Sequence, residues 1–140
     1  MEKSKLVKAL LVVSGMIGMG IGGALLFAPV AFEASVGVSL GRDINLLSEL
    51  RAPGGMIVIA GVLIMLGVFI SRMTPISVFL SCLFYLSFGL SRVVGMILDG
   101  IPNQSILTSA IIEMVIGLLS LLVLVNHGTM RRIFAPEDNG

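Results

Sequence analysis

The stretch FGLSRVVGMILDGIP, residues 88–102, decides how the chain must fold, because it places an arginine inside a long apolar segment. A charged side chain near the centre of a membrane helix costs roughly 2.5 to 3.5 kcal/mol, so such residues usually face the interior of a helix bundle. The turn-forming run from Asp99 to Pro102 ends this segment. Arg92 is therefore the first candidate for a buried polar site, and other helices must shield it.

The composition is that of a membrane protein. Of the 140 residues, 56% are hydrophobic and 12% are charged, which lies far outside the averages for soluble domains. The net charge of +1 leaves no broad basic surface for neutralising phosphates, so nucleic acid is excluded as a partner. The single cysteine, Cys82, cannot form an intramolecular disulfide and has no neighbouring set of metal ligands. No metal site is predicted.

Four apolar segments are long enough to cross a bilayer, since a membrane helix needs about 20 apolar residues. They predict spans over residues 9–29, 52–70, 76–98 and 106–126, within a single domain of residues 1–130. Residues 131–140 are predicted to form a polar cytoplasmic tail. The expected fold is an all-α membrane protein, a bundle of four transmembrane helices. A signal peptide is the rival interpretation of the first segment, but its apolar run is longer than a usual signal core.

Residues 29–50 are the one sizeable segment outside the predicted spans, and we expect a loop that leads into a short helix. Asp43 or Asn45 is expected to cap that helix, and Pro53 to start or kink the second span. Glu49 and Arg51 are accordingly expected at the membrane boundary.

The orientation follows from the basic residues near the span ends, which are more frequent on the cytoplasmic side. Arg42 and Arg51 belong to one side of the predicted membrane. The other side holds a larger set of basic residues, namely Lys3, Lys5, Lys8, Arg72, Arg131 and Arg132. Both termini are therefore predicted to be cytoplasmic.

Residues 18–23, GMGIGG, match the G-x-G-x-x-G pattern of dinucleotide-binding folds. That motif requires a strand, a glycine turn and a helix within an α/β sheet, and the sequence contains long apolar segments instead. The small residues Ser14, Gly18 and Gly22 recur every four positions. This spacing predicts a groove for close packing against another membrane helix.

Arg92 and Glu113 are predicted to form an ion pair. At 1.5 Å per residue, Arg92 lies roughly 10 Å below the outer end of the third span, and Glu113 lies at a similar depth in the fourth. Antiparallel neighbouring helices would bring the two side chains level, and a guanidinium keeps a carboxylate ionised in a poorly solvated site.

Further polar residues share faces with this pair. Tyr85 and Asp99 lie seven residues either side of Arg92, and Ser109 lies four residues before Glu113. With Glu49 and Arg51 at the outer mouth, the sequence predicts a cavity lined by two arginines and up to three carboxylates. The alternative is a structural clamp, a buried ion network that fixes helix register without binding a ligand.

Three segments together resemble a widespread bacterial family of short four-span membrane proteins that is labelled a domain of unknown function. They are residues 45–55 (NLLSELRAPGG), residues 89–92 (GLSR) with 99–102 (DGIP), and residues 113–117 (EMVIG). The resemblance covers residues 45–125 and more loosely extends to DoxX-like proteins, some of which are subunits of quinone-linked oxidoreductases. It implies a protein of the bacterial inner membrane and no established activity. Quinone as a cofactor rests on this analogy alone, and no other cofactor is evident.

The sequence favours a non-enzymatic protein that binds a small amphiphile or a lipid head group in the outer half of the bundle. It could also be an accessory subunit of a larger membrane complex or a homo-oligomer. One alternative is a quinone-linked redox subunit, although no haem, flavin or Cys-x-x-Cys signal is present. Another is a small transporter or proton pathway through Glu113. No residue is an obvious nucleophile.

Overall fold

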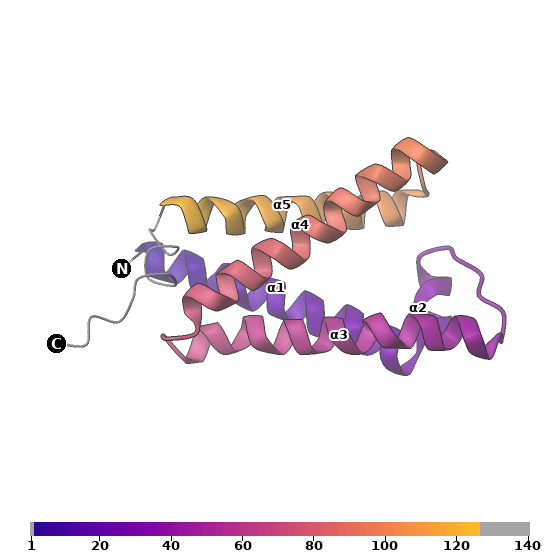
Figure 1. The fold of residues 1–140 in the computed structure, drawn as a ribbon, viewed down its shortest axis with the longest axis horizontal. Helices are drawn as coiled ribbons and strands as arrows, with labels where there is room; N and C mark the ends of the chain where they lie inside the picture. The colour runs from indigo at the N-terminus through magenta and orange to yellow at the C-terminus, as the bar shows by residue number, and fades with distance from the viewer. Residues whose placement is uncertain (1, 127–140) are drawn as a thin grey trace.

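The computed structural model describes residues 2–126, with side chains from Lys5 onward. It contains five helices, α1 (Glu2–Phe27), α2 (Pro29–Ser35), α3 (Ile44–Phe69), α4 (Thr74–Asp99) and α5 (Gln104–Asn126), and no strand within the described residues (Figure 1). All except α2 are long and apolar enough to cross a membrane. The predicted all-α fold with four membrane-spanning helices is confirmed. The predicted tail at 131–140 lies outside the described residues.

The segment before the second span is more helical than the sequence analysis predicted. Residues 29–35 form α2, which begins at Pro29 because proline fits the first turn of a helix, where no amide donor is needed. The next helix, α3, begins at Ile44 rather than Ala52 and continues through Pro53. Its start is capped by Asp43, whose carboxylate accepts a hydrogen bond of 2.8 Å from the amide of Asn45. Pro53 therefore lies inside α3 and does not start it.

Glycines bring α1 and α3 into close contact. A Cβ atom added to Gly18 would lie 3.2 Å from the Cα of Gly61, and one added to Gly22 would lie 2.6 Å from the amide nitrogen of Val58. Small residues allow backbones to approach in this way, and close packing is a main source of helix association in lipid. The predicted groove is confirmed at Gly18 and Gly22. The hydroxyl of Ser14 instead donates to the Leu10 carbonyl within α1, and the backbone carbonyl of Ser14 accepts a hydrogen bond from the Tyr85 hydroxyl of α4.

The pair formed by α4 and α5 is also closely packed. A Cβ atom at Gly117 would lie 2.8 Å from the amide nitrogen of Leu86, and Gly89 approaches the backbone of Met114. The hydroxyls of Ser81 and Ser120 are fully buried and lie 3.0 Å apart, within hydrogen-bonding distance. The bundle therefore consists of two antiparallel helix pairs (Figure 1).

The two helix pairs meet at one end of the bundle and diverge at the other (Figure 1). We call these the closed end, which holds the α3–α4 turn at residues 70–73, and the α2 end, which holds α2 and the α4–α5 turn at residues 100–103. At the closed end Leu11, Ile64 and Val78 belong to one buried apolar cluster. The hydroxyl of Ser77 there donates a 2.7 Å hydrogen bond from α4 to the Leu63 carbonyl of α3. The closed end is a packed core.

The orientation in the membrane remains a prediction, and the structure provides positions that test it. Ser39 and Ser71 are both exposed, the first in the loop after α2 and the second in the α3–α4 turn. In a Cys82→Ala background, a cysteine at Ser39 should react with a membrane-impermeant maleimide added to intact cells, whereas a cysteine at Ser71 should react only after lysis. The reverse labelling pattern would place the termini outside.

Candidate functional site

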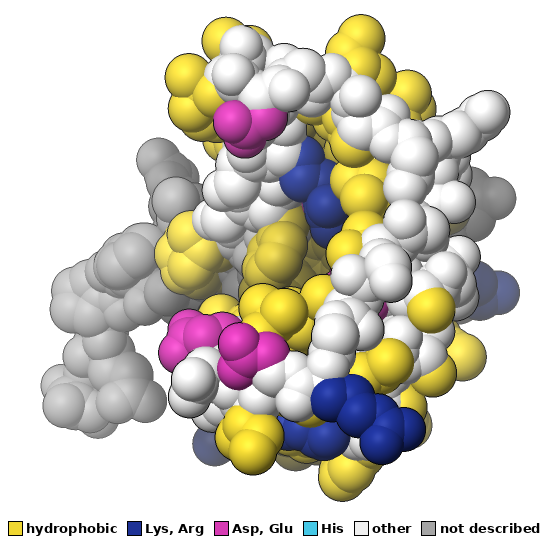
Figure 2. All heavy atoms as spheres, turned by 90° about the vertical axis from the view of Figure 1, so that its right-hand side faces the viewer, with side chains coloured by type: hydrophobic (Ala, Val, Ile, Leu, Met, Phe, Trp, Pro, Cys, Tyr) yellow, Lys and Arg dark blue, Asp and Glu magenta, His cyan; other side chains and the backbone are white. Residues whose placement is uncertain are grey.

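A cavity of about 260 Å³ lies between the two helix pairs towards the α2 end. Side chains from all five helices line it, and most of these side chains are apolar. Figure 2 shows the molecule from the α2 end, with a hollow in which hydrophobic side chains and a basic group are visible. Five residues with polar side chains also line the cavity, namely Glu33, Tyr85, Arg92, Ser109 and Glu113.

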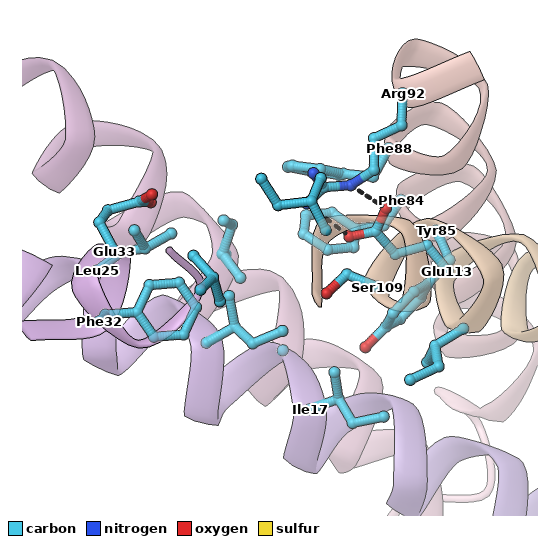
Figure 3. Close-up of a pocket in the computed structure, with 16 residues that line it drawn as sticks. Ile17, Leu25, Phe32, Glu33, Phe84, Tyr85, Phe88, Arg92, Ser109 and Glu113 are labelled. Atoms are coloured by element: carbon cyan, nitrogen blue, oxygen red, sulfur yellow. Dashed lines mark hydrogen bonds and ion pairs between the residues drawn. The ribbon is translucent and has the colours of Figure 1, made fainter. Parts of the chain in front are cut away.

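Arg92 and Glu113 form the ion pair that their equal depth predicted. The Arg92 Nε donates to Glu113 Oε2 at 2.7 Å, and Arg92 Nη2 donates to Oε1 at 3.2 Å, so the contact is bidentate (Figure 3). Such two-point contacts fix both the distance and the plane of the guanidinium. The Glu113 side chain is 11% exposed and the Arg92 side chain 33%, so the carboxylate is the more deeply enclosed partner.

The arginine retains hydrogen-bonding capacity after this contact. A guanidinium has five N–H donors, and two of them are used by Glu113. Within residues 2–126 no other acceptor bonds to the Arg92 side chain. Because Arg92 also lines the cavity, its remaining donors are available to a molecule that enters there.

Tyr85 and Ser109 contribute a polar wall with few free donors. The Tyr85 hydroxyl donates to the Ser14 carbonyl, which links α4 to α1, and the residue is 2% exposed. The Ser109 hydroxyl donates to the Ser105 carbonyl at 3.1 Å within α5. Both hydroxyl oxygens can still accept a hydrogen bond. Because both hydroxyl protons are already used, Tyr85 and Ser109 contribute acceptor oxygens and part of the cavity wall.

The other three candidate residues lie outside the cavity. Glu49, Arg51 and Asp99 are exposed and do not contribute to its lining. Arg51 donates through Nη1 to the Leu26 carbonyl, and so satisfies one of the unpaired carbonyls at the end of α1. The expected lining of two arginines and up to three carboxylates is therefore corrected to one arginine and two carboxylates.

The second carboxylate belongs to Glu33, which the sequence analysis did not select. Phe32 and Glu33 extend from α2 on the side of the cavity opposite Arg92. The Glu33 carboxylate is directed from α2 towards the side that holds Arg92 (Figure 3). A local signal existed, because Pro29 favours a helix start and so indicates a short helix that contains Phe32 and Glu33. The apolar and turn-forming pattern of residues 29–50 predicts a loop there instead, so Glu33 is not among the predicted site residues.

Asn103 ties α2 to the α4–α5 turn beside the cavity. Its Nδ2 donates to the Val36 carbonyl at 2.7 Å, and its Oδ1 accepts from the Ile106 amide at 3.1 Å and so caps α5. The next residue after Val36, Gly37, has a φ of 83°, and a Cβ atom there would approach Asn103 Nδ2 to 3.0 Å. Asn103 thereby holds the segment that carries Phe32 and Glu33 against the cavity.

The chain matches the profile of one protein family over residues 6–124, a family described as "Domain of unknown function (DUF4345)". Neither a curated protein nor a solved structure matches the chain. Among the residues with described structure, no group of three or more His, Cys, Asp and Glu side chains could hold a metal ion.

Proposed function

The chain belongs to the family of unknown function DUF4345, and from the site itself we propose that it is a membrane protein that binds a small amphiphile in the cavity at its α2 end. The observation that carries the proposal is the composition of the lining, which is mainly apolar with a few convergent polar groups. Binding sites for small molecules typically have this composition, because apolar surface supplies affinity and the polar groups fix orientation.

The position of the ion pair favours a ligand site over a clamp. A pair that serves only to fix helix register is expected to be packed on all sides, as protein interiors generally are. Arg92 and Glu113 instead form part of a cavity wall, and a third of the arginine side chain is exposed. The uncommitted guanidinium donors would meet the polar end of a ligand while the apolar walls enclose its hydrocarbon part.

The closed end of the bundle favours a dead-ended pocket over a transport path. Below the cavity the buried residues Leu11, Ile64 and Val78 pack against one another. Lys5, Lys8 and Arg72 are exposed at that end, so the proposed orientation places the cavity in the outer half of a bacterial plasma membrane. A ligand would enter from the outer leaflet or from outside the cell.

Filling the cavity tests the proposal. The proposal predicts that an amphiphile co-purifies with the protein and that Ser109→Phe removes it, because the new ring occupies the cavity that Ser109 lines. Thr108→Phe is the matched control, since Thr108 is exposed, lies outside the lining and makes the same hydrogen bond to a carbonyl four residues earlier. Native mass spectrometry of protein released from detergent micelles should show the bound mass in the wild type and in Thr108→Phe.

The proposal predicts loss of the bound mass from Ser109→Phe alone. Equal retention in both variants, or equal absence in the wild type and both variants, would contradict a ligand in this cavity. Because Cys82 is 7% exposed and is the single cysteine, the slow reaction of its thiol with a maleimide confirms that each variant is folded.

A further inference from the structure

We propose that the ligand of this cavity carries a positively charged nitrogen, which lies against the Glu33 carboxylate. This inference rests on the proposed function and specifies the chemical class of the amphiphile. The same chemistry occurs in a free alkylamine and in the amine-bearing head group of a lipid.

The charges in the lining are unbalanced. Arg92 and Glu113 neutralise each other through their bidentate contact, and Glu33 adds a further negative charge. Among the described residues Arg92 forms a salt bridge with Glu113, whereas Glu33 forms none and so has no cationic partner there. The cavity lining therefore carries a net charge of −1.

Occupation of the cavity changes the environment of Glu33. The residue is partly exposed and lines the cavity, so an amphiphile that fills this space displaces water from the carboxylate. Removing solvent from a carboxylate without a compensating partner is costly. A neutral or anionic ligand leaves that cost in place, whereas a ligand with an ammonium group offsets it.

Aromatic rings line both sides of the cavity. Phe32 lies beside Glu33 on α2, and Phe84 and Phe88 lie on the opposite side (Figure 3). The rings of Phe84 and Phe88 have centroids 4.8 Å apart, and Phe84 meets Tyr85 edge to face at 5.5 Å. The faces of such rings attract alkylammonium groups, so Phe32 beside Glu33 would add to the attraction that the carboxylate provides.

Arg92 determines what can accompany the cation. Its unused N–H donors can bind an oxygen of the same ligand, such as a hydroxyl or a phosphate ester. A head group that has an ammonium next to an oxygen acceptor would therefore contact both sides of the cavity at once. A simple alkylamine would use the Glu33 side alone.

The experiment compares probes with the same hydrocarbon chain and different charge. Protein in maltoside detergent is titrated with dodecyltrimethylammonium, dodecanoate and dodecanol, and binding is measured by native mass spectrometry. The wild type should bind the cation roughly tenfold more tightly than the neutral probe. Glu33→Gln should abolish that preference, Glu33→Asp should retain most of it, and Glu49→Gln, which changes an exposed carboxylate outside the lining, should leave it unchanged.

A second arm distinguishes the two sources of the amine. The protein is released from nanodiscs that contain equal amounts of phosphatidylethanolamine and phosphatidylglycerol. It should retain phosphatidylethanolamine if the ligand is a lipid with an amine head group, and it should retain neither lipid if the ligand is a free amine. Selective retention of phosphatidylglycerol, or a cation preference that persists in Glu33→Gln, would overturn the inference. Equal binding of all three probes in the wild type would also overturn it while leaving the proposed function intact. Absence of binding by every probe, with no bound mass in the wild type, would overturn both.

Discussion

Replacing Arg92 with methionine is expected to lower the free energy of unfolding by about 3 to 5 kcal/mol, the usual cost of removing one partner from a buried ion pair. The substitution leaves the Glu113 carboxylate without its two donors, in a position where the residue is 8% exposed. Glu113→Gln should cost less. It leaves the guanidinium unpaired, but that side chain is 33% exposed and can be solvated through the cavity.

The double variant measures the contact itself. Arg92→Met combined with Glu113→Gln should be less destabilised than the sum of the single variants, with a coupling above about 1 kcal/mol, as is usual for residues in direct contact. Unfolding in mixed detergent micelles, followed by circular dichroism, gives the free energies. Strict additivity would show that the two side chains do not interact in the membrane protein.

A further variant at Arg92 separates a ligand site from a clamp. Both interpretations predict the coupling in the empty protein, since both require the ion pair. The proposed function also predicts that Arg92→Lys, which keeps the charge and loses the bidentate geometry, reduces ligand retention while the protein remains folded. Unchanged retention in this variant would remove Arg92 from the ligand contacts.

The sequence located the ion pair because depth in a membrane helix can be counted along the chain. Arg92 and Glu113 lie at comparable distances from the turn that joins their helices. Hydropathy and helical rise were therefore sufficient to predict that the two side chains are neighbours. The same reasoning identified Tyr85 and Ser109, which share faces with the pair. Each of these positions depends on helix rotation, which the polar spacing along α4 and α5 determines.

Depth along a helix does not predict which residues near the α2 end line the cavity. Glu49, Arg51 and Asp99 have suitable depths, but their lateral positions depend on how far the helix pairs diverge and on where α3 begins. Glu33 depends on the turn at Ala28 that redirects the chain into α2. Pro29 indicates that a helix starts there, but the hydrogen bond from Asn103 to the Val36 carbonyl, which holds this segment beside the cavity, is a tertiary contact that a single sequence does not predict.

Replacing Gly22 with leucine is the second substitution with a large expected effect, because it separates α1 from α3. The new Cβ would lie 2.6 Å from the Val58 amide nitrogen and 2.8 Å from the Gly54 carbonyl oxygen. Both are backbone atoms of the facing helix, so a change of side-chain rotamer cannot relieve the overlap. Overpacking of this kind costs about 1 to 3 kcal/mol, and occasionally more.

Gly20→Leu is the matched control for this substitution. Gly20 lies on the same helix two residues away, and a Cβ atom there would have no neighbour within 4 Å. Any gain from replacing a glycine within a helix is common to both variants, so their difference reports the contact with α3. The temperature at which the buried Cys82 thiol becomes reactive should fall for Gly22→Leu and stay near the wild-type value for Gly20→Leu. Equal temperatures would mean that the two helices do not pack through Gly22, and the cavity walls formed by α1 would then have to be placed differently.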